Sequence, residues 1–394
     1  MEPITMALFP KASDRPGWRR LVRPVFVLAA GLLLASVLAF GGASAASAAD
    51  DVFTVANVPV DATAATAAAA RERALQEGQR HAFQRLLQRL TPASQRARLP
   101  QLSDSAIADL VRDFEIAGEK TSPVRYIASL TVRFKPVEVR NALRDSGMAF
   151  SETPSKPVLV LPIVESSGGR VLSDSTDWYA AWARAVPGDG LVPFMLPGSA
   201  DEVSALVPPD AAAAGDERTL MPLVARVGAG SVLVAVARPH ADDATGRDGI
   251  DVSARRVGAA AGEETFVASF APQPTDTVAA AVYDRAVAAV EAEIEETWKQ
   301  SSVLRFDSMR SIAARVPLGE LGSLVAVERG LDGLAPVQRV DIIRIGRDEA
   351  EFRLTFMGDE EQLRLLLAQR DLLLSGDGGG YVLRPASARP GSSR

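Results

Sequence analysis

The chain has 394 residues, of which 47% are hydrophobic, and this is enough for two or three packed domains. It has no cysteine and only two histidines, which excludes disulfides, thiol catalysis, thiolate metal sites and a lipid-bearing cysteine. The formal net charge of −6 comes without a basic patch, so we expect no nucleic-acid partner.

The first 48 residues have the pattern of a signal peptide. Basic residues up to Arg23 precede an apolar run over Val25–Phe40, and small residues follow as far as Ala48. This order predicts cleavage near Ala48 and a periplasmic or otherwise exported protein. The apolar run is shorter than the roughly twenty residues of a membrane span, so membrane contact is expected only if the segment stays uncleaved.

Residues 50–150 predict a β-α-α-β-β-α module. A strand over 50–60 precedes a long helix over Ala62–Leu90, with Asp61 in the position of an N-cap. Strict alternation from Tyr126 to Phe134 predicts a strand with one buried face.

A middle α/β module is predicted over 156–300. The continuous apolar runs at 158–164 and 231–237 are typical of strands buried on both faces. Their alternation with helical segments predicts a partly parallel sheet with helical crossovers. A hairpin over 249–270 and a long helix over 275–299 complete it.

The segment 301–385 predicts a small α+β module, followed by a disordered tail over 386–394. We expect a strand at 301–306, a helix at 307–315, strands at 321–328, 337–347 and 350–356, a helix at 360–369, and a final hairpin around 376–379. The fold class is therefore α+β, with three small α/β modules after a signal peptide.

The chain resembles the DUF2066 family, a family of exported bacterial proteins of unknown function. The resemblance rests on the block VANVPVDATAATAAAARERALQEGQRHAFQRLLQRLT, the strand Tyr126–Pro136, the run VLVLPIV, the helix with Trp178 and Trp182, and LVARVGAGSVLVAVA. These motifs are structural, and the resemblance implies export but supplies no site residues.

Trp178, Tyr179 and Trp182 form the most unusual cluster in an aromatic-poor chain. At this spacing Trp178 and Trp182 share one helix face, while Tyr179 points elsewhere. Burial against the sheet is the preferred interpretation. The alternative is a partner-binding or glycan-binding anchor, because Trp and Tyr are common at binding hot spots.

Other candidate residues favour structural roles. His81 and His240 lack further metal ligands nearby, and Gly168-Gly169 belongs to no phosphate-loop motif. The carboxylates near His240 and the Glu residues between 291 and 296 are interpreted as solvated. Asp174 and Asp177 could flank a glycosidic bond, but acidic pairs are too common in loops to count as evidence. We therefore expect no catalytic residue, metal or cofactor.

These observations predict an exported cell-envelope protein that acts as a non-catalytic binding or assembly module, with other envelope proteins as partners. The alternative is a carboxylate-dependent hydrolase or a carbohydrate-binding protein that uses the middle module. Buried Trp178 and Trp182 would favour the first, and an aromatic-lined cleft with convergent carboxylates would favour the second.

Overall fold

A computed structural model describes residues 52–186, 188–241, 248–258, 264–273, 276, 280–304, 309–318, 321–376 and 380–386. The predicted signal peptide with its cleavage site, Asp242 and Asp243, the turn at 377–379 and the tail from 387 lie outside these residues. The chain from Ala48 onward groups as one compact unit, so the module boundaries near 150 and 300 stay predictions.

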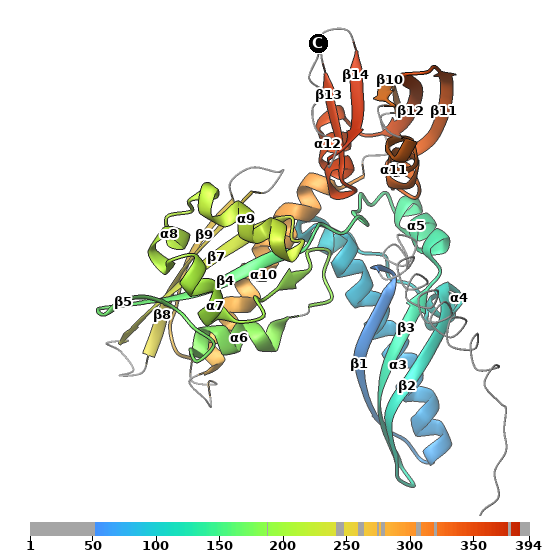
Figure 1. Ribbon diagram of the computed structural model, residues 1–394. Helices are drawn as coiled ribbons and strands as arrows, with labels where there is room; N and C mark the ends of the chain where they lie inside the picture. Colours follow the sequence, from blue (N-terminus) through green and yellow to red (C-terminus); the bar gives the residue numbers. More distant parts are fainter. Residues whose placement is uncertain are drawn as a thin grey trace, which may run out of the picture. The chain divides into compact units, whose positions relative to one another are not determined.

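The first sheet is antiparallel with the strand order β1-β3-β2. Its strands are β1 (Thr54–Thr63), β2 (Val111–Thr121) and β3 (Arg125–Phe134). Along β3 every second side chain from Tyr126 to Phe134 is buried, as the alternation predicts. These side chains pack against helix α3 (Ala67–Leu90), which lies along the sheet in Figure 1.

Helix α3 begins later than the sequence predicts. Its N-cap is Thr66, whose hydroxyl accepts a hydrogen bond from the N–H of Ala69 at 3.2 Å. Asp61 lies instead in β1, where its carboxylate pairs with Arg125 on β3. Strand pairing therefore extends through Thr63 and displaces the helix start. The shorter helices of this region are η1 (Ala93–Arg98), α4 (Asp104–Leu110) and α5 (Pro136–Asp145).

The middle sheet has the order β5-β4-β7-β8-β9, with β6 also paired to β4. Strands β4, β6 and β7 are mutually parallel where they pair, and the other pairs are antiparallel. The strands are β4 (Val158–Ser166), β5 (Gly169–Leu172), β6 (Phe194–Met195), β7 (Ser231–Ala241), β8 (Asp248–Val257) and β9 (Glu264–Phe270).

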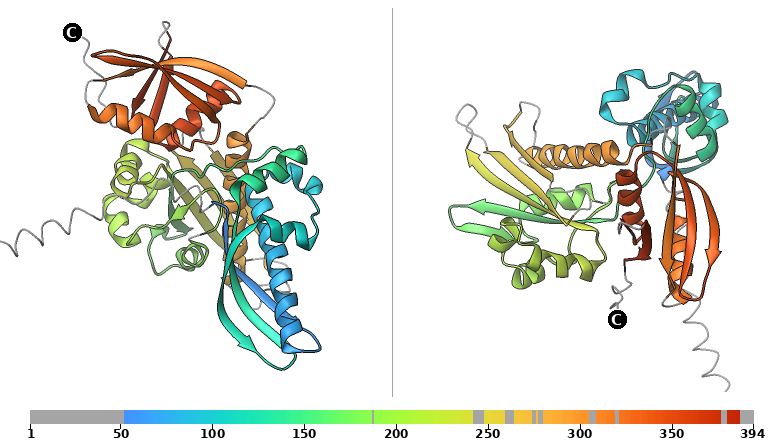
Figure 2. Two further views of the ribbon diagram at one scale, coloured as in Figure 1. Left: turned by 90° about the vertical axis from the view of Figure 1, so that its right-hand side faces the viewer. Right: turned by 90° about the horizontal axis from the view of Figure 1, so that it is seen from above.

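Strand β4 is buried on both faces, as its continuous apolar sequence predicts. Val158 and Val160 belong to one hydrophobic core, whereas Leu159 and Leu161 belong to a second core. The right view of Figure 2 shows the long helix α10 on one face of this sheet and shorter helices on the other. The helices are α6 (Asp177–Ala185), α7 (Ala200–Leu206), α8 (Pro209–Ala213), α9 (Glu217–Val227) and α10 (Ala280–Ser302).

The third sheet has the order β11-β12-β10-β14-β13 and is antiparallel except for the β10–β14 pair. Its strands are β10 (Met309–Pro317), β11 (Val337–Ile345), β12 (Glu349–Met357), β13 (Leu372–Gly376) and β14 (Tyr381–Pro385). Helices α11 (Leu321–Leu331) and α12 (Glu360–Gln369) lie on the same face of it in Figure 2, left.

Two predicted elements at the start of this segment are wrong. Residues 309–315 form strand β10 rather than a helix, because Ile312, Ala314 and Val316 alternate toward the core. Residues 321–328 form part of helix α11 rather than a strand, and Val327 and Leu331 give it a buried face. The predicted strand at 301–306 is also wrong at its start, because Ser301 and Ser302 end helix α10.

The α+β class and the partly parallel middle sheet are confirmed. Helices and strands contribute side chains to the same two hydrophobic cores. Within the described residues, no helix combines the length and apolarity that crossing a bilayer requires.

Candidate binding surface at strand β11

The aromatic cluster of α6 is part of the core. Trp178 and Trp182 are fully buried, and their rings meet edge to face with centroids 5.8 Å apart. The indole N–H of Trp178 donates to the carbonyl of Ala235 in β7 at 2.9 Å. Tyr179 points to the other core and donates its hydroxyl to the carbonyl of Pro197 at 3.3 Å. The two tryptophans therefore join α6 to the sheet and offer no surface to a partner.

The remaining sequence candidates stay apart from one another. His81 is exposed on α3. Gly168 lies in the tight turn between β4 and β5, and Gly169 is the first residue of β5. The carboxylate of Asp174 accepts the N–H of Ala200 at 2.9 Å, so it anchors a helix start. His240 lies 3.8 Å from Asp251. Among the described residues, no group of three or more His, Asp and Glu side chains is placed to hold a metal.

The glutamates of α10 contradict the solvated face that the sequence suggested. Glu293 is exposed, but Glu291, Glu295 and Glu296 are partly buried. The carboxylate of Glu295 accepts the N–H groups of Leu191 and Val192 at 3.1 and 2.7 Å. It therefore ties the segment before β6 to the helix.

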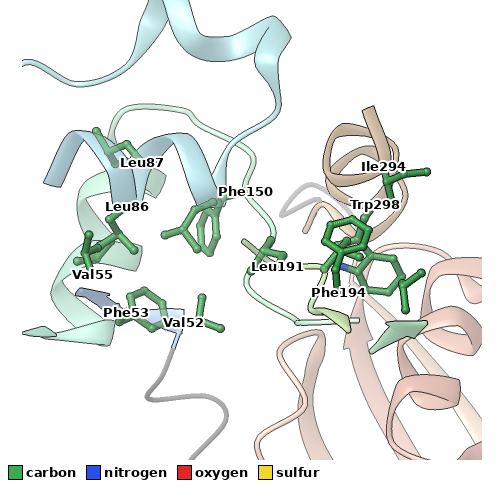
Figure 3. Packing of buried hydrophobic residues seen from close by; sticks show 14 of the residues in the cluster. Val52, Phe53, Val55, Leu86, Leu87, Phe150, Leu191, Phe194, Ile294 and Trp298 are labelled. Atoms are coloured by element: carbon green, nitrogen blue, oxygen red, sulfur yellow. The ribbon is translucent and has the colours of Figure 1, made fainter. Parts of the chain in front are cut away.

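Gly190 fits closely against this carboxylate. A Cβ atom at position 190 would lie 1.9 Å from Oε1 of Glu295, so any side chain there would displace Glu295. Figure 3 shows the apolar side of the same junction, with Leu191 and Phe194 next to Ile294 and Trp298.

Two cations complete this charged junction. Arg89 at the end of α3 is buried and donates to the carbonyls of Val52 and Thr54, both at 2.7 Å. Lys299 is also buried, and its ammonium donates to the carbonyl of Gln88 at 3.2 Å. Each cation therefore binds backbone oxygens of a segment that is distant in sequence.

Burial controls the protonation of the junction. Burial and the neighbouring Glu295 carboxylate raise the pKa of Glu291 to about 7. Burial likewise raises the pKa of Glu295 and lowers the pKa of Lys299. Besides these backbone groups, Arg89 pairs with Asp189 at 2.9 Å, and Lys299 pairs with Glu296 at 3.5 Å. The arrangement therefore holds chain segments together.

A hollow of about 230 Å³ lies beside the linker that precedes β4. Two of the three cations that line it have partners: Arg140 pairs with Glu152 at 2.7 Å, and Lys156 pairs with Asp371 at 2.5 Å. The guanidinium of Arg140 also lies over the ring of Phe53. These contacts indicate a structural role for the basic residues in its wall.

Strand β11 is the place where the fold leaves apolar surface in water. It lies at the end of its sheet, paired with β12 alone among the described strands (Figure 1). Four of its side chains are large, aliphatic and 38–59% exposed: Val340, Ile342, Ile343 and Ile345. On the described part of every other edge strand, at most one large hydrophobic side chain is exposed.

The edge strand β2 shows the usual alternative. It carries Arg112, Asp113, Glu115, Glu119 and Lys120, all exposed, with one exposed large apolar side chain. Charged side chains protect a sheet edge from pairing with another chain. Strand β11 lacks this protection along Ile342–Ile343.

A β-bulge decides which side of the sheet each β11 side chain occupies. Val340 and Ile342 lie opposite Leu354 and Phe352 of β12, which are buried on the helix side. The register then shifts between Ile342 and Arg344, so that Ile345 faces Ala350 on that same side. Three aliphatic side chains thus share one face, and Ile343 is the additional residue at the bulge.

The outer face of β11 is charged. Asp341 lies opposite Arg353, and Arg344 lies opposite Glu351. Within the strand Arg339 binds Asp341 at 2.7 Å, and Arg344 binds Glu349, the first residue of β12, at 3.0 Å. These pairs are exposed, so they contribute little to stability and can exchange for other partners.

An open hollow of about 380 Å³ lies next to the apolar face of β11. Val340, Ile342 and Phe352 line its sheet side, and Glu328 and Leu331 line it from α11. Helix α11 packs over β10 and β14, and the apolar side chains of β11 stay exposed beyond it. The surface formed by β11 and this hollow is hereafter called the β11 surface.

Sequence reasoning found this strand but missed its role. The prediction of a strand at 337–347 is confirmed by β11. The signal for an open edge was the run Asp-Ile-Ile-Arg-Ile, in which apolar residues do not alternate strictly with polar ones. A fully buried strand has a similar pattern, so only the strand order shows that this one is an edge.

A family model described as a domain of unknown function, DUF8605, matches residues 53–152. The match spans the first sheet with α3, α4 and α5, and covers about a quarter of the chain. It overturns the suggested resemblance to DUF2066, because the matching domain is a different one. No curated protein matches the chain.

Proposed function

We propose that the chain is an exported, non-catalytic binding or assembly protein of the cell envelope that joins another polypeptide through the β11 surface. The observation that carries the proposal is the group of four exposed aliphatic side chains on an unprotected sheet edge. An edge strand presents free backbone N–H and C=O groups, and an added strand satisfies them while its side chains fill adjacent apolar hollows.

Export is the second part of the proposal and rests on the order of basic, apolar and small residues before Ala49. Mass spectrometry of the protein recovered from its cells should give a chain that starts near Ala49. Recovery of a chain that retains Met1 in the membrane fraction would contradict the soluble, exported form.

Two observations weigh against the hydrolase or carbohydrate-binding alternative. The aromatic side chains expected to contact sugar, Trp178 and Trp182, lie in the core, and the carboxylate of Asp174 accepts the backbone N–H of Ala200. No observation on the described residues favours it.

Site-specific photo-crosslinking in intact cells tests the binding function. A photoreactive amino acid replaces Ile342, which is 50% exposed on β11. The matched control replaces Val267, which is 74% exposed on the edge strand β9. We expect a crosslink to an envelope polypeptide from position 342 and none from position 267. Silence at position 342, or equal crosslinking at both positions, would contradict the proposal.

A further inference from the structure

We infer that the polypeptide at the β11 surface is a second copy of this chain, which pairs antiparallel through its own β11. This inference rests on the proposed function and names its partner. Ile342 of each copy lies opposite Ile343 of the other, with Asp341 opposite Arg344 and Val340 opposite Ile345. Such a two-fold contact uses the same patch on both copies and closes after two subunits.

Charge complementarity supports this register. Asp341 and Arg344 lie on the same outer face of β11, so each copy offers an acid where the other offers a base. The two-fold axis produces this ion pair twice. Opposite charges directly across a strand pair stabilise it, whereas like charges destabilise it.

The bulge supports the same register independently. Residues directly opposite in an antiparallel pair share a face, yet residues five apart in a regular strand point to opposite faces. The bulge between Ile342 and Arg344 brings Val340 and Ile345 onto one face. Only with this shift can they lie opposite each other.

Neighbouring registers fit less well. Centring the pair on Asp341 sets that carboxylate against its own copy, and centring it on Ile342 sets apolar Val340 against charged Arg344. Centring it on Val340 keeps an Arg339–Asp341 pair but leaves the exposed Ile345 outside the contact. The proposed register alone covers all four exposed aliphatic side chains with one another.

The absence of cysteine makes the register directly measurable, because an introduced thiol has no competitor in the chain. Val340→Cys and Ile345→Cys chains, distinguished by tags of different length, are mixed and oxidised. The expected product is the mixed disulfide. In this register the two copies of residue 340 lie about 17 Å apart, too far for a disulfide. Self-linked Val340→Cys chains would overturn the register.

The oligomeric state of the full chain, purified from the cells that make it, gives the second readout. Sedimentation should show a dimer, and Ile342→Arg should raise its dissociation constant by about 100-fold, because it brings two unpaired charges into the contact. The matched control is Leu373→Arg, on the opposite edge strand of the same sheet, where the leucine is 40% exposed. That variant should leave the dimer unchanged.

A charge swap separates specific pairing from a general loss of apolar surface. Asp341→Arg should weaken the dimer about tenfold, and adding Arg344→Asp should restore it. Failure of the double variant to recover would overturn the inference.

The proposed function and this inference can fail separately. A monomeric chain that still crosslinks from position 342 to a different envelope protein overturns the second copy and leaves the binding function intact. A monomer that is also silent in crosslinking overturns both.

Discussion

On β11 four aliphatic side chains lie in water, whereas along the end of α10 three carboxylates and a lysine lie largely out of it. Both regions depart from the usual distribution, in which charged groups are exposed and large apolar groups are covered. Glu295, Glu296 and Lys299 have partners within the chain, whereas the buried Oε1 of Glu291 has no hydrogen-bond partner among the described residues. The exposed aliphatic side chains of β11 are in contact with water instead.

The buried charges and the exposed aliphatic side chains therefore have different roles. The charges of α10 fix segments that are distant in sequence, namely the end of α3 and the loop before β6. Their removal should therefore change stability. The aliphatic residues of β11 contribute little to the monomer, because they remain solvated, and their removal should change association instead.

The largest expected effect concerns Glu295. Glu295→Ala leaves two backbone N–H groups without their acceptor and deprives Arg89 and Lys299 of a nearby charge. We expect the free energy of unfolding to fall by about 3 kcal/mol. Urea denaturation measures it. Glu293→Ala, on the exposed side of the same helix, is the control and should change stability by less than about 0.5 kcal/mol. Equal losses of stability in Glu295→Ala and Glu293→Ala would contradict the structural role of the Glu295 carboxylate.

The second prediction concerns pH. The pKa of Glu291 is about 7 in the folded chain and 4.5 in the unfolded one, so the native state holds a proton that the unfolded state has released. Stability should therefore rise as the pH falls from about 7 toward 4.5, and the cost of the charged form is fully present above about 7.

Replacing this carboxylate should remove that dependence. Glu291→Gln should be more stable than the wild type at about pH 8, by an amount on the order of 2 kcal/mol, and the difference should vanish near pH 4.5. Unfolding curves across this range measure it, with Glu293→Gln as the exposed control. Parallel pH profiles for the wild type and Glu291→Gln would show that Glu291 is solvated.

The third prediction compares two buried indole groups. Trp178 donates a hydrogen bond to Ala235, whereas the indole N–H of Trp182 has no partner among the described residues. Both changes to phenylalanine remove similar ring volume. Trp178→Phe should therefore cost about 1 kcal/mol more than Trp182→Phe. The reverse order in thermal unfolding would contradict the assigned bond.

The smallest effect is expected on β11. Ile342→Lys, measured at a concentration where the chain is monomeric, should change the free energy of unfolding by less than about 0.5 kcal/mol. Association should fall sharply in the same variant. A large loss of monomer stability would show that Ile342 belongs to the core and would remove the contrast with Glu295.

Local patterns predicted most of the elements from sequence. The alternation in β3, the continuous apolar β4 and the apolar face of α3 each appear as expected. Errors arose where two patterns compete. Strand β10 contains the adjacent alanines Ala313 and Ala314, which favour a helix, and the start of α11 resembles an apolar strand.

The candidate surface could not be predicted in the same way, because it depends on strand order. An apolar strand inside a sheet and one at its edge have the same composition, and only the pairing of β10 with β12 and β14 leaves β11 outside. The buried glutamates of α10 were missed for a related reason. Their partners lie about a hundred residues or more away in sequence.

The bulge at Ile343 divides β11 into two short segments. Before it, the even-numbered residues Val340 and Ile342 face the helix side, and after it the odd-numbered Ile345 does. Without the bulge the same residues would alternate regularly, which would turn Ile345 to the charged side and Arg344 to the apolar side. Composition would hardly change, yet the surface presented to a neighbour would differ. For this edge the number of residues between side chains matters as much as their identity: deleting Ile343 would remove the bulge and still leave Arg344 and Ile345 on their present faces.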